Sequence, residues 1–346
     1  MPRYLFIVPT DGQPSGGVSV ILDFVMRLQE LGFQAEAITD RPDYSYRFAS
    51  TGPRMIYAPQ IGAALARMDG RKFWRRWRRR LSSAFGAVKP MLDLRPDDVI
   101  IVPEFGAGLY PHGFPDNQCV LLVQGHYIFA SVICSEGYDG DRFAAVISTS
   151  QACDRITSLY GCANRYMIPL QVDEDLFSYS EIKQPVIAFM PRRREEEIKL
   201  IMELLRRSGR LTGRYEFCPI DQMPRQKVAE MMGRARIFLS FSQNEGFGLP
   251  PAEAMAAGCI VIGYTGVGGD EFLTSESGFP VPDGDLSSYV DTILQVVEEY
   301  DEDPARLDEM RRKASQMVLS RYSAQKQKAR LREVFSDLDA SLSRAR

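Results

Sequence analysis

The sequence predicts an α/β protein of two domains, each built on a parallel β-sheet flanked by helices. Short apolar runs of strand length alternate along the chain with longer segments of helical periodicity, a pattern typical of β-α-β units. The length of 346 residues suits two domains of about 150 residues better than one core. A polar stretch without a clear period, 173–184, separates two such α/β runs and is the expected linker.

The N-terminal domain is expected over 1–172 and opens with an apolar strand at 4–9. A glycine-rich loop ending in Gly16 and Gly17 leads into a helix over 18–31, whose apolar positions repeat on one side. The segment 33–39 is the next strand. The opening lacks a complete G-x-G-x-x-G, which disfavours a nicotinamide-binding site.

The stretch from Arg71 to Val88, RKFWRRWRRRLSSAFGAV, combines an apolar stripe with seven basic residues. A basic amphipathic helix with tryptophan suits an anionic membrane surface, where each basic residue is worth about 1 kcal/mol. The alternative is an ordinary helix whose stripe packs on the sheet and whose charged face is solvated. Both hypotheses stay open. A nucleic-acid role is disfavoured, because no binding module accompanies the basic run.

Polar residues follow two of the later strands in this domain. Glu104 comes after a strand at 99–102, and Gln124-Gly125-His126 follows the strand at 120–123. Parallel sheets bind ligands at the carboxyl ends of their strands, so these residues are candidates for a site. A hydrogen-bonded structural histidine is the alternative for His126. Further strands are expected at 145–149 and 166–169, and a helix at 152–160.

The C-terminal domain, expected over 185–325, begins with a strand at 185–190 that is followed by Arg192, Arg193 and Arg194. Arginines placed directly after a strand can neutralise a diphosphate, and they can do so bidentately. The alternative is a solvated basic run that starts a helix. A strand and turn at 215–220 and a helix at 228–235 follow.

The most informative stretch lies between 237 and 273. A strand at 237–240 leads into a loop with glycines, a helix is expected over 252–257, and a second strand follows at 260–262. Glu245 and Glu253 bracket the loop with seven residues between them. A helix N-terminus attracts phosphate, while ionised carboxylates accept hydrogen bonds from sugar hydroxyls. The stretch therefore predicts a nucleotide-sugar pocket; the alternative is a capping glutamate and a turn that merely needs glycine. Helices are expected beyond it at 288–300, 306–320 and 323–342.

Composition excludes several classes of protein. The 42 basic and 45 acidic residues give a net charge of -3, which indicates no general affinity for nucleic acid. No apolar run approaches the roughly 20 residues of a membrane span, and the apolar start is too short for a signal peptide. The six cysteines form no CxxC and no zinc-like cluster, so we expect them to be reduced. We expect a cytoplasmic protein, with peripheral binding to the inner face of the membrane depending on the basic stretch.

Residues 244–272, NEGFGLPPAEAMAAGCIVIGYTGVGGDEF, resemble the signature of the family-four retaining glycosyltransferases of the GT-B fold. The likeness rests on the two glutamates around GFGLP and on the second glycine turn, 266–269, before an acidic residue. The resemblance implies two Rossmann-like domains whose parallel sheets face across a central cleft. The acceptor would bind to the N-terminal domain and the nucleotide sugar to the C-terminal domain. The last helix, 326–346, would cross back to the N-terminal domain.

The resemblance also implies roles for single residues. Glu245 would lie by the donor sugar, Glu253 would bind the ribose, and Arg192 would bind the diphosphate. His126 would contact the sugar, so that Glu245, Arg192 and His126 form the implied catalytic set. The family lysine that follows the arginine has no clean match here. Its alternatives are Arg193, Arg194 and Lys199. The implied donor-binding residues are Gly16, Gly17, Arg193, Lys199, Ile220, Gly246, Phe247, Gly248, Leu249 and Glu253.

The implied activity is the transfer of a hexose- or deoxyhexose-type sugar from a nucleotide diphosphate sugar to an acceptor hydroxyl. It would retain the anomeric configuration, use no metal or cofactor, and serve bacterial cell-surface glycan or glycolipid assembly with a glycan or lipid-linked acceptor. Cations and amides would stabilise charge on the leaving diphosphate. One alternative is an inactive GT-B protein that binds a nucleotide sugar or scaffolds a partner transferase. An epimerase of the same fold would need further acid/base residues that the sequence does not reveal.

Overall fold

The computed structural model describes residues 2–10, 16–46, 52–68, 91–137 and 139–344. The basic stretch 71–88 and most of the loop before Gly16 lie outside these residues. The chain forms two compact units. Unit 1 comprises Met1–Ile168 together with Lys328–Arg346, and unit 2 comprises Pro169–Gln327.

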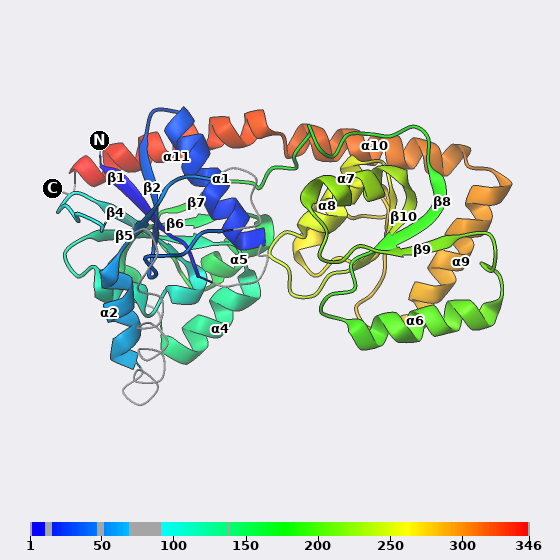
Figure 1. Cartoon of the computed structure of the whole chain (residues 1–346), viewed down its shortest axis with the longest axis horizontal. Coiled ribbons are helices and arrows are strands. Elements are labelled where there is room, and N and C mark those ends of the chain that lie inside the picture. The colour runs from blue at the N-terminus through cyan, green and yellow to red at the C-terminus, as the bar shows by residue number, and fades with distance from the viewer. Residues whose placement is uncertain (1, 11–15, 47–51, 69–90, 138, 345–346) are drawn as a thin grey trace. The chain divides into compact units, whose positions relative to one another are not determined.

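Unit 1 is built on a seven-stranded sheet in the order β3-β2-β1-β4-β5-β6-β7, and every pairing is parallel (Figure 1). Its strands are β1 (Arg3–Ile7), β2 (Gln34–Thr39), β3 (Met55–Tyr57), β4 (Val99–Pro103), β5 (Gln118–Val123), β6 (Phe143–Ser148) and β7 (Arg165–Met167). Its helices are α1 (Gly16–Glu30), α2 (Pro59–Met68), η1 (Glu104–Gly106), η2 (Tyr110–Gly113), α4 (His126–Glu136), η3 (Gly140–Arg142), α5 (Gln151–Leu159) and, from Lys328 onward, α11 (Ala324–Arg344).

Unit 2 has a five-stranded parallel sheet in the order β12-β11-β10-β8-β9. Its strands are β8 (Gln184–Phe189), β9 (Glu216–Pro219), β10 (Ala235–Phe241), β11 (Ile260–Tyr264) and β12 (Phe279–Pro280). Its helices are α6 (Glu195–Ser208), α7 (Arg225–Arg234), α8 (Leu249–Ala256), η4 (Gly268–Glu271), α9 (Leu286–Glu302) and α10 (Ala305–Arg321).

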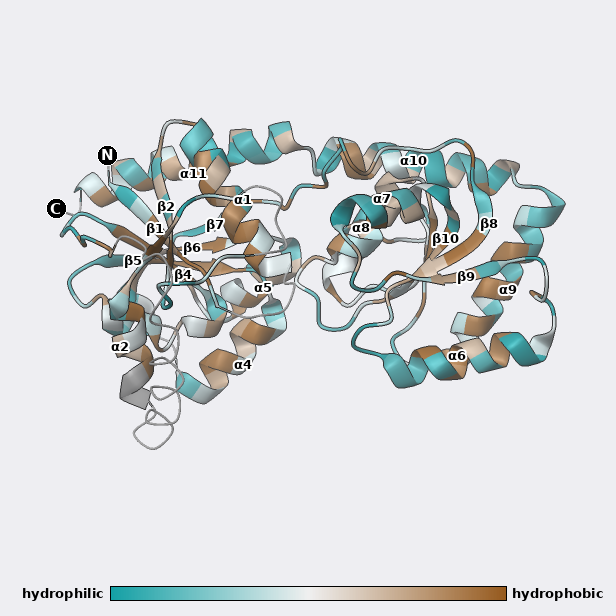
Figure 2. Ribbon diagram, in the orientation of Figure 1, coloured by the Kyte–Doolittle hydropathy of each residue, from teal (hydrophilic) through white to brown (hydrophobic). Residues whose placement is uncertain are grey.

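The inner strands are apolar because helices cover both faces of a parallel sheet. All five residues of β1, β4 and β11 are buried, and Figure 2 shows apolar strands beside helices with polar outer faces. Glycine is required where Tyr289 crosses β11. A Cβ on Gly263 would lie 2.2 Å from the Tyr289 hydroxyl and 2.3 Å from the Ser240 carbonyl oxygen.

The strand order gives each sheet a switch point, where consecutive connections run in opposite directions. In unit 1 the chain moves from β1 to β2 and β3, then returns to the other side of β1 with β4. In unit 2 it moves from β8 to β9, then returns to the other side of β8 with β10. Ligands of open α/β sheets bind outside the carboxyl ends of the strands at such points. Glu104 follows β4, and the Arg192–Arg194 run follows β8.

The predicted linker, 173–184, is part of unit 2. Phe177 is fully buried there. Lys183 Nζ donates hydrogen bonds to the carbonyl oxygens of Met232, Gly233 and Ala257 at 3.0, 3.0 and 2.7 Å. The sequence did not predict these contacts, because one buried apolar side chain and one lysine produce no periodic hydrophobic pattern.

Helices α2 and α4, the body of α6 and strands β3 and β12 were missing from the prediction, and α8 begins earlier than predicted. Only Phe129 and Ile133 of α4 are buried, while Tyr127 and Ile128 are exposed, so this apolar helix lacks a clear amphipathic period. Helix α8 starts at Leu249 rather than 252, since prolines fit the first turn, where their missing N–H groups need no partner. Glu253 consequently lies on the second turn.

The C-terminal part of α11 packs on the sheet of unit 1. Phe335 is fully buried and its ring lies 4.7 Å from that of Tyr4 and 6.2 Å from that of Phe6. The Tyr4 hydroxyl donates a 2.6 Å hydrogen bond to Asp339. The boundary between the units at this end falls after Gln327, two residues beyond the predicted end of the C-terminal domain.

Candidate functional site

The carboxyl edge of the unit 2 sheet carries an unusual backbone. Arg193, Gln222, Asn244 and Val267 have φ angles of 76°, 49°, 51° and 72°, and they follow β8, β9, β10 and β11 respectively. Among the described residues, the one other non-glycine with positive φ is Asn164. Such conformations cost about 1–3 kcal/mol each and cluster at functional sites, with a β-branched residue the clearest outlier. This edge is therefore the candidate site.

The two glycine turns of the sequence lie against each other at this edge. The N–H of Glu245 donates to the carbonyl oxygen of Gly266 at 2.9 Å, and the N–H of Gly268 donates to that of Glu245 at 3.1 Å. A Cβ on Gly268 would lie 2.5 Å from the Gly246 carbonyl and from the Phe247 nitrogen. Only glycine allows this approach, which fixes the loop that carries Glu245.

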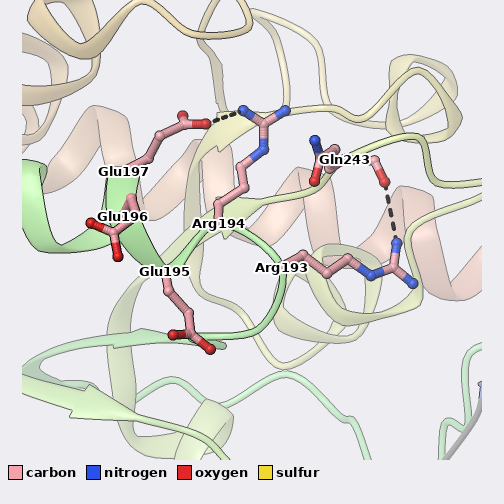
Figure 3. A pocket seen from close by; sticks show the side chains of 6 residues that line it. All are labelled: Arg193, Arg194, Glu195, Glu196, Glu197 and Gln243. Carbon is pink, nitrogen blue, oxygen red and sulfur yellow. Dashed lines mark hydrogen bonds and ion pairs between the residues drawn. The ribbon is translucent and has the colours of Figure 1, made fainter.

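Arg193 reaches the same loop from the end of β8. Its Nη1 lies 2.7 Å from Glu245 Oε1 and donates to the carbonyl oxygen of Gln243 at 3.2 Å. Burial raises the pKa of the Glu245 carboxyl, and Arg193 opposes that rise. Arg193 lines an open cavity of about 380 Å³ with Arg194, Gln243 and the first turn of α6 (Figure 3). The pair places a cation beside a carboxylate at the sheet edge.

The other two arginines of the run have different surroundings. Arg192 is half-exposed and pairs with Asp221, which follows β9, at 3.1 Å. Arg194 is buried: it pairs with Asp283 at 2.5 Å and stacks 4.5 Å above the Tyr264 ring. Figure 3 shows its further bond to Glu197, drawn away from Arg193. Arg194 therefore stabilises the start of α6 and is not available to a ligand.

Lys199, the remaining alternative for the family lysine, lies on α6. It is exposed and pairs with Glu196 at 2.9 Å, one turn earlier on the same helix. Glu196 lines the cavity, whereas Lys199 does not. Among Arg193, Arg194 and Lys199, the structure brings Arg193 to the glutamate loop.

Glu253 is buried on α8 and meets a cation from α7. Arg225 Nη2 lies 3.2 Å from Glu253 Oε1. Burial raises the pKa of Glu253 to about 7, Arg225 opposes the rise, and Asp173 adds to it. A buried carboxyl of this kind ionises near neutral pH, where it can accept hydrogen bonds from hydroxyl groups.

The loop between the glutamates offers backbone rather than side chains. Phe247 is buried, with its ring 5.1 Å from Phe272 and 4.8 Å from Tyr322. Gly248 has φ 91° and precedes Leu249, where α8 begins. The second and third residues of α8 are prolines and lack N–H groups, so the helix N-terminus offers fewer amides than predicted.

Ile220 lies next to the end of β9. Its side chain is buried, and its N–H donates to the carbonyl oxygen of Phe189 at 2.7 Å. The backbone amide is thus committed to the sheet, and contact with a ligand is restricted to the carbonyl group.

Unit 1 places Glu104 and His126 at the ends of adjacent strands, β4 and β5. Glu104 is 4% exposed, and its Oε2 has no hydrogen-bond partner among the described residues. Burial raises its pKa to about 7, and backbone N–H groups of Glu104, Gln124 and Gly125 oppose the rise. His126 is the first residue of α4. A Cβ on Gly125 would lie 3.2 Å from Glu104 Oε1, which shows how closely the turn before His126 packs on the carboxyl.

Gly16 and Gly17 begin α1, and a Cβ on Gly16 would meet no atom within 4 Å. Nothing in the packing of the described residues requires glycine at position 16.

Sequence reasoning missed three residues of the site: Asp221, Gln243 and Arg225. Asp221 and Gln243 are polar and follow β9 and β10, so a search of every strand end would have found them. Arg225 gave no signal, since only folding brings α7 beside Glu253.

None of the described helices is long and apolar enough to cross a membrane. Within the same residues, no group of three or more His, Cys, Asp or Glu side chains is arranged to hold a metal ion.

Residues 215–315 match the family model described as glycosyl transferases group 1. An alpha-1,6-glucosyltransferase of Actinobacillus pleuropneumoniae serotype 7 (strain AP76) is 30% identical over 131 residues, which cover 36% of this chain and 40% of that protein. A putative glycosyltransferase of a Sulfolobus islandicus filamentous virus (isolate Iceland/Hveragerdi) is 35% identical over 71 residues, 20% of this chain and 21% of that protein. The chain thus spans two fifths or less of these curated relatives.

Solved structures are similar over nearly the whole chain. Sucrose-phosphate synthase from Thermosynechococcus elongatus has a TM-score of 0.67 at 15% identity, covering 98% of this chain and 100% of that one. Anabaena HepE in complex with UDP and glucose has a TM-score of 0.63 at 14% identity, covering 97% of this chain and 100% of that one. These likenesses confirm the fold class predicted from the sequence.

Proposed function

We propose that this chain, which has the GT-B fold and carries a glycosyl transferases group 1 domain over residues 215–315, is a glycosyltransferase. It would move a sugar from a nucleotide diphosphate sugar to an acceptor hydroxyl. The observation that carries the proposal is the Arg193–Glu245 pair, held at the switch point of the unit 2 sheet by two interlocked glycine turns. The glucosyltransferase relative and the UDP-bound HepE structure support the same class of donor.

Arg193 and Arg192 would neutralise the diphosphate. Both are at least half-exposed, and both hold carboxylates that an incoming anion can replace. A guanidinium binds phosphate oxygens bidentately, and fixed positive charge stabilises the leaving group as its bond to the sugar breaks. When the diphosphate engages Arg193, Glu245 Oε1 becomes free to accept a hydrogen bond from the donor sugar. Arg193 thus takes the place of the family lysine.

Glu253 would bind the ribose hydroxyls, and Ile220 would meet the nucleobase through its carbonyl group. His126 would orient the sugar, and Glu104 would contact the acceptor. The proposal includes a hexose- or deoxyhexose-type sugar, retention of anomeric configuration without a metal, and a role at the cytoplasmic face in cell-surface glycan or glycolipid assembly. Binding to an anionic membrane surface through Arg71 to Val88 stays a prediction of the sequence.

The test is to incubate the full chain with UDP-, GDP- and dTDP-sugars and glycan or lipid-linked acceptors, and to measure release of nucleoside diphosphate. We expect release with at least one donor, and a loss of about 100-fold or more in kcat/KM for Glu245→Gln. Glu276→Gln, an exposed glutamate of the same unit, is the control and should keep its activity. Binding of a nucleotide sugar without turnover would instead support the inactive scaffold, and no binding at all would refute both.

A further inference from the structure

Arg225 is the first residue of α7 and contacts Glu253 of α8 from outside the glycine loop. Its Nη2 lies 3.2 Å from Glu253 Oε1, its Nη1 lies 3.9 Å from Asp173 Oδ2, and its guanidinium lies 5.7 Å from the centre of the Phe177 ring. The Arg225 side chain is 46% exposed, whereas that of Glu253 is 11% exposed. An accessible cation therefore meets a carboxylate that the protein buries.

The contact between them is made by one nitrogen and one oxygen. Nη2 donates to Oε1, whereas Nη1 lies 3.9 Å from Asp173 Oδ2, so the guanidinium does not bind Glu253 bidentately. An ionised carboxylate offers about four acceptor sites on its two oxygens. A single-point contact leaves most of these sites for other donors, which a bidentate pair would not.

We propose that Arg225 is a positioning residue of a nucleoside subsite: it keeps Glu253 ionised and oriented so that the carboxylate accepts hydrogen bonds from both hydroxyls of a ribose. The ligand class is a ribonucleoside diphosphate. This inference rests on the function proposed for Glu253, and it adds a residue from outside the loop to the recognition of the donor.

The groups that face Glu253 define its response to pH. Arg225 comes from α7 and favours ionisation, while Asp173, from the segment before β8, opposes it. At the opposite end of α8, Lys183 binds the Ala257 carbonyl oxygen, and Arg311 of α10 lies 3.4 Å from where a Cβ on Gly258 would be. Burial raises the pKa of Glu253 to about 7. Near neutral pH, loss of a nearby positive charge such as Arg225 would therefore change the ionised fraction of this carboxyl.

The consequence is a pH-dependent affinity. Ribose hydroxyls donate to an ionised carboxylate, so binding should weaken as the pH falls through 7. Removing Arg225 removes the opposing cation, which raises the pKa of Glu253 further. The variant without Arg225 should therefore bind more weakly than the wild type up to a higher pH. The difference in affinity should become smaller under alkaline conditions, where Glu253 is ionised in both proteins. A purely structural link between α7 and α8 would not produce this shift.

The experiment is calorimetric titration of the full chain with UDP, GDP and 2′-deoxy-UDP between pH 6 and 9. The variants are Arg225→Met, Arg225→Lys, Glu253→Gln and the double variant Arg225→Met/Glu253→Gln. Arg234→Met, at the other end of α7 where it pairs with Gln184, is the matched control. Folding of every variant is checked by thermal unfolding.

We expect Arg225→Met to weaken binding of the preferred ribonucleotide by about tenfold at pH 7 and by less at pH 9. Arg225→Lys should restore part of the affinity, Arg234→Met should match the wild type, and the double variant should bind no more weakly than Glu253→Gln. If UDP is the nucleotide that binds, the wild type should bind UDP more tightly than 2′-deoxy-UDP. Arg225→Met should reduce this difference in affinity.

Two results would overturn the inference. The first is an unchanged nucleotide affinity and pH profile in Arg225→Met. The second is a double variant whose loss of binding free energy equals the sum of the losses in Arg225→Met and Glu253→Gln. If Arg225→Met fails to fold, the wild-type pH profile and Arg225→Lys decide, and a flat profile counts against the proposal. Failure of the proposed transferase activity is distinguishable, because the wild-type protein would then bind a nucleotide in this titration without releasing nucleoside diphosphate from a nucleotide sugar. No binding of any nucleotide to the wild-type protein would refute both the function and this inference.

Discussion

The two sheets share a parallel architecture and a switch point, but their strand ends carry opposite electrostatics. At the unit 2 edge, Arg193 pairs with Glu245 and Arg192 pairs with Asp221. At the unit 1 edge, the carboxyl of Glu104 is buried, and no charged side chain is among the groups that shift its pKa. One fold therefore provides an edge with two half-exposed arginines and an edge with a buried carboxyl whose pKa is raised to about 7.

Glu104 and Glu253 sharpen the contrast. Burial raises the pKa of both to about 7, yet only Glu253 has a guanidinium in contact. A carboxyl with a cation partner is suited to accept hydrogen bonds from a ligand. A carboxyl that meets backbone N–H groups alone can be protonated at neutral pH and donate a hydrogen bond. The difference in partners, rather than the difference in burial, separates the two edges.

The largest expected effect is the loss of the cation at the unit 2 edge. Arg193→Ala should lower kcat/KM for transfer by about 10²–10³-fold, because it removes charge-assisted donors from the leaving diphosphate. Lys199→Ala is the control. It should change kcat/KM by no more than about twofold, because Lys199 makes only an exposed ion pair with Glu196, and such pairs contribute little. Equal effects of the two substitutions, measured by steady-state kinetics, would show that Arg193 is not the cation that replaces the family lysine.

The next effect compares the glycines of the two edges. Gly268→Ala should destabilise unit 2 by about 1–3 kcal/mol and weaken donor binding, because its Cβ would press on the backbone of the Glu245 loop. Gly16→Ala in unit 1 has open space and should leave the free energy of unfolding unchanged or raise it. Urea unfolding measures both, and equal stability of the two variants would contradict the interlocked turns.

The last effect concerns Glu104 and, unlike the other two, depends on pH. The folded-state pKa, about 7, exceeds the ordinary value of 4.5 for a glutamate, so the folded state holds the proton more tightly. The stability that this provides is complete below pH 4.5 and is lost as the pH rises through 7. Glu104→Gln cannot ionise, so its free energy of unfolding relative to wild type should rise by about 3 kcal/mol between pH 4 and 9. Urea unfolding at several pH values checks this, with exposed Glu136→Gln as the control; parallel curves for wild type and Glu104→Gln would contradict it.

Much of the fold followed from local patterns. The strands at β1, β4, β5, β6, β8 and β10 coincide with apolar runs of the right length, because the inner strands of covered parallel sheets are apolar on both faces. The helix α4 escaped prediction, since its exposed Tyr127 and Ile128 obscure any amphipathic period. The segment 173–184 escaped too, because its attachment to unit 2 depends on contacts with residues distant in the sequence, such as those of Lys183 with Ala257 and of Arg311 with the Ser180 and Glu181 carbonyl oxygens.

The sequence by itself determined the α/β architecture, the two glycine turns and the position of Glu245 and Glu253 around GFGLP, since each of these depends on residues that are neighbours along the chain. It left three candidates for the second cation and gave no sign of Arg225. Tertiary structure decided both questions. Whether an arginine reaches a carboxylate depends on which strands and helices become adjacent, and Arg193 meets Glu245 only because β10 pairs with β8. Arg225 meets Glu253 because α7 packs beside α8.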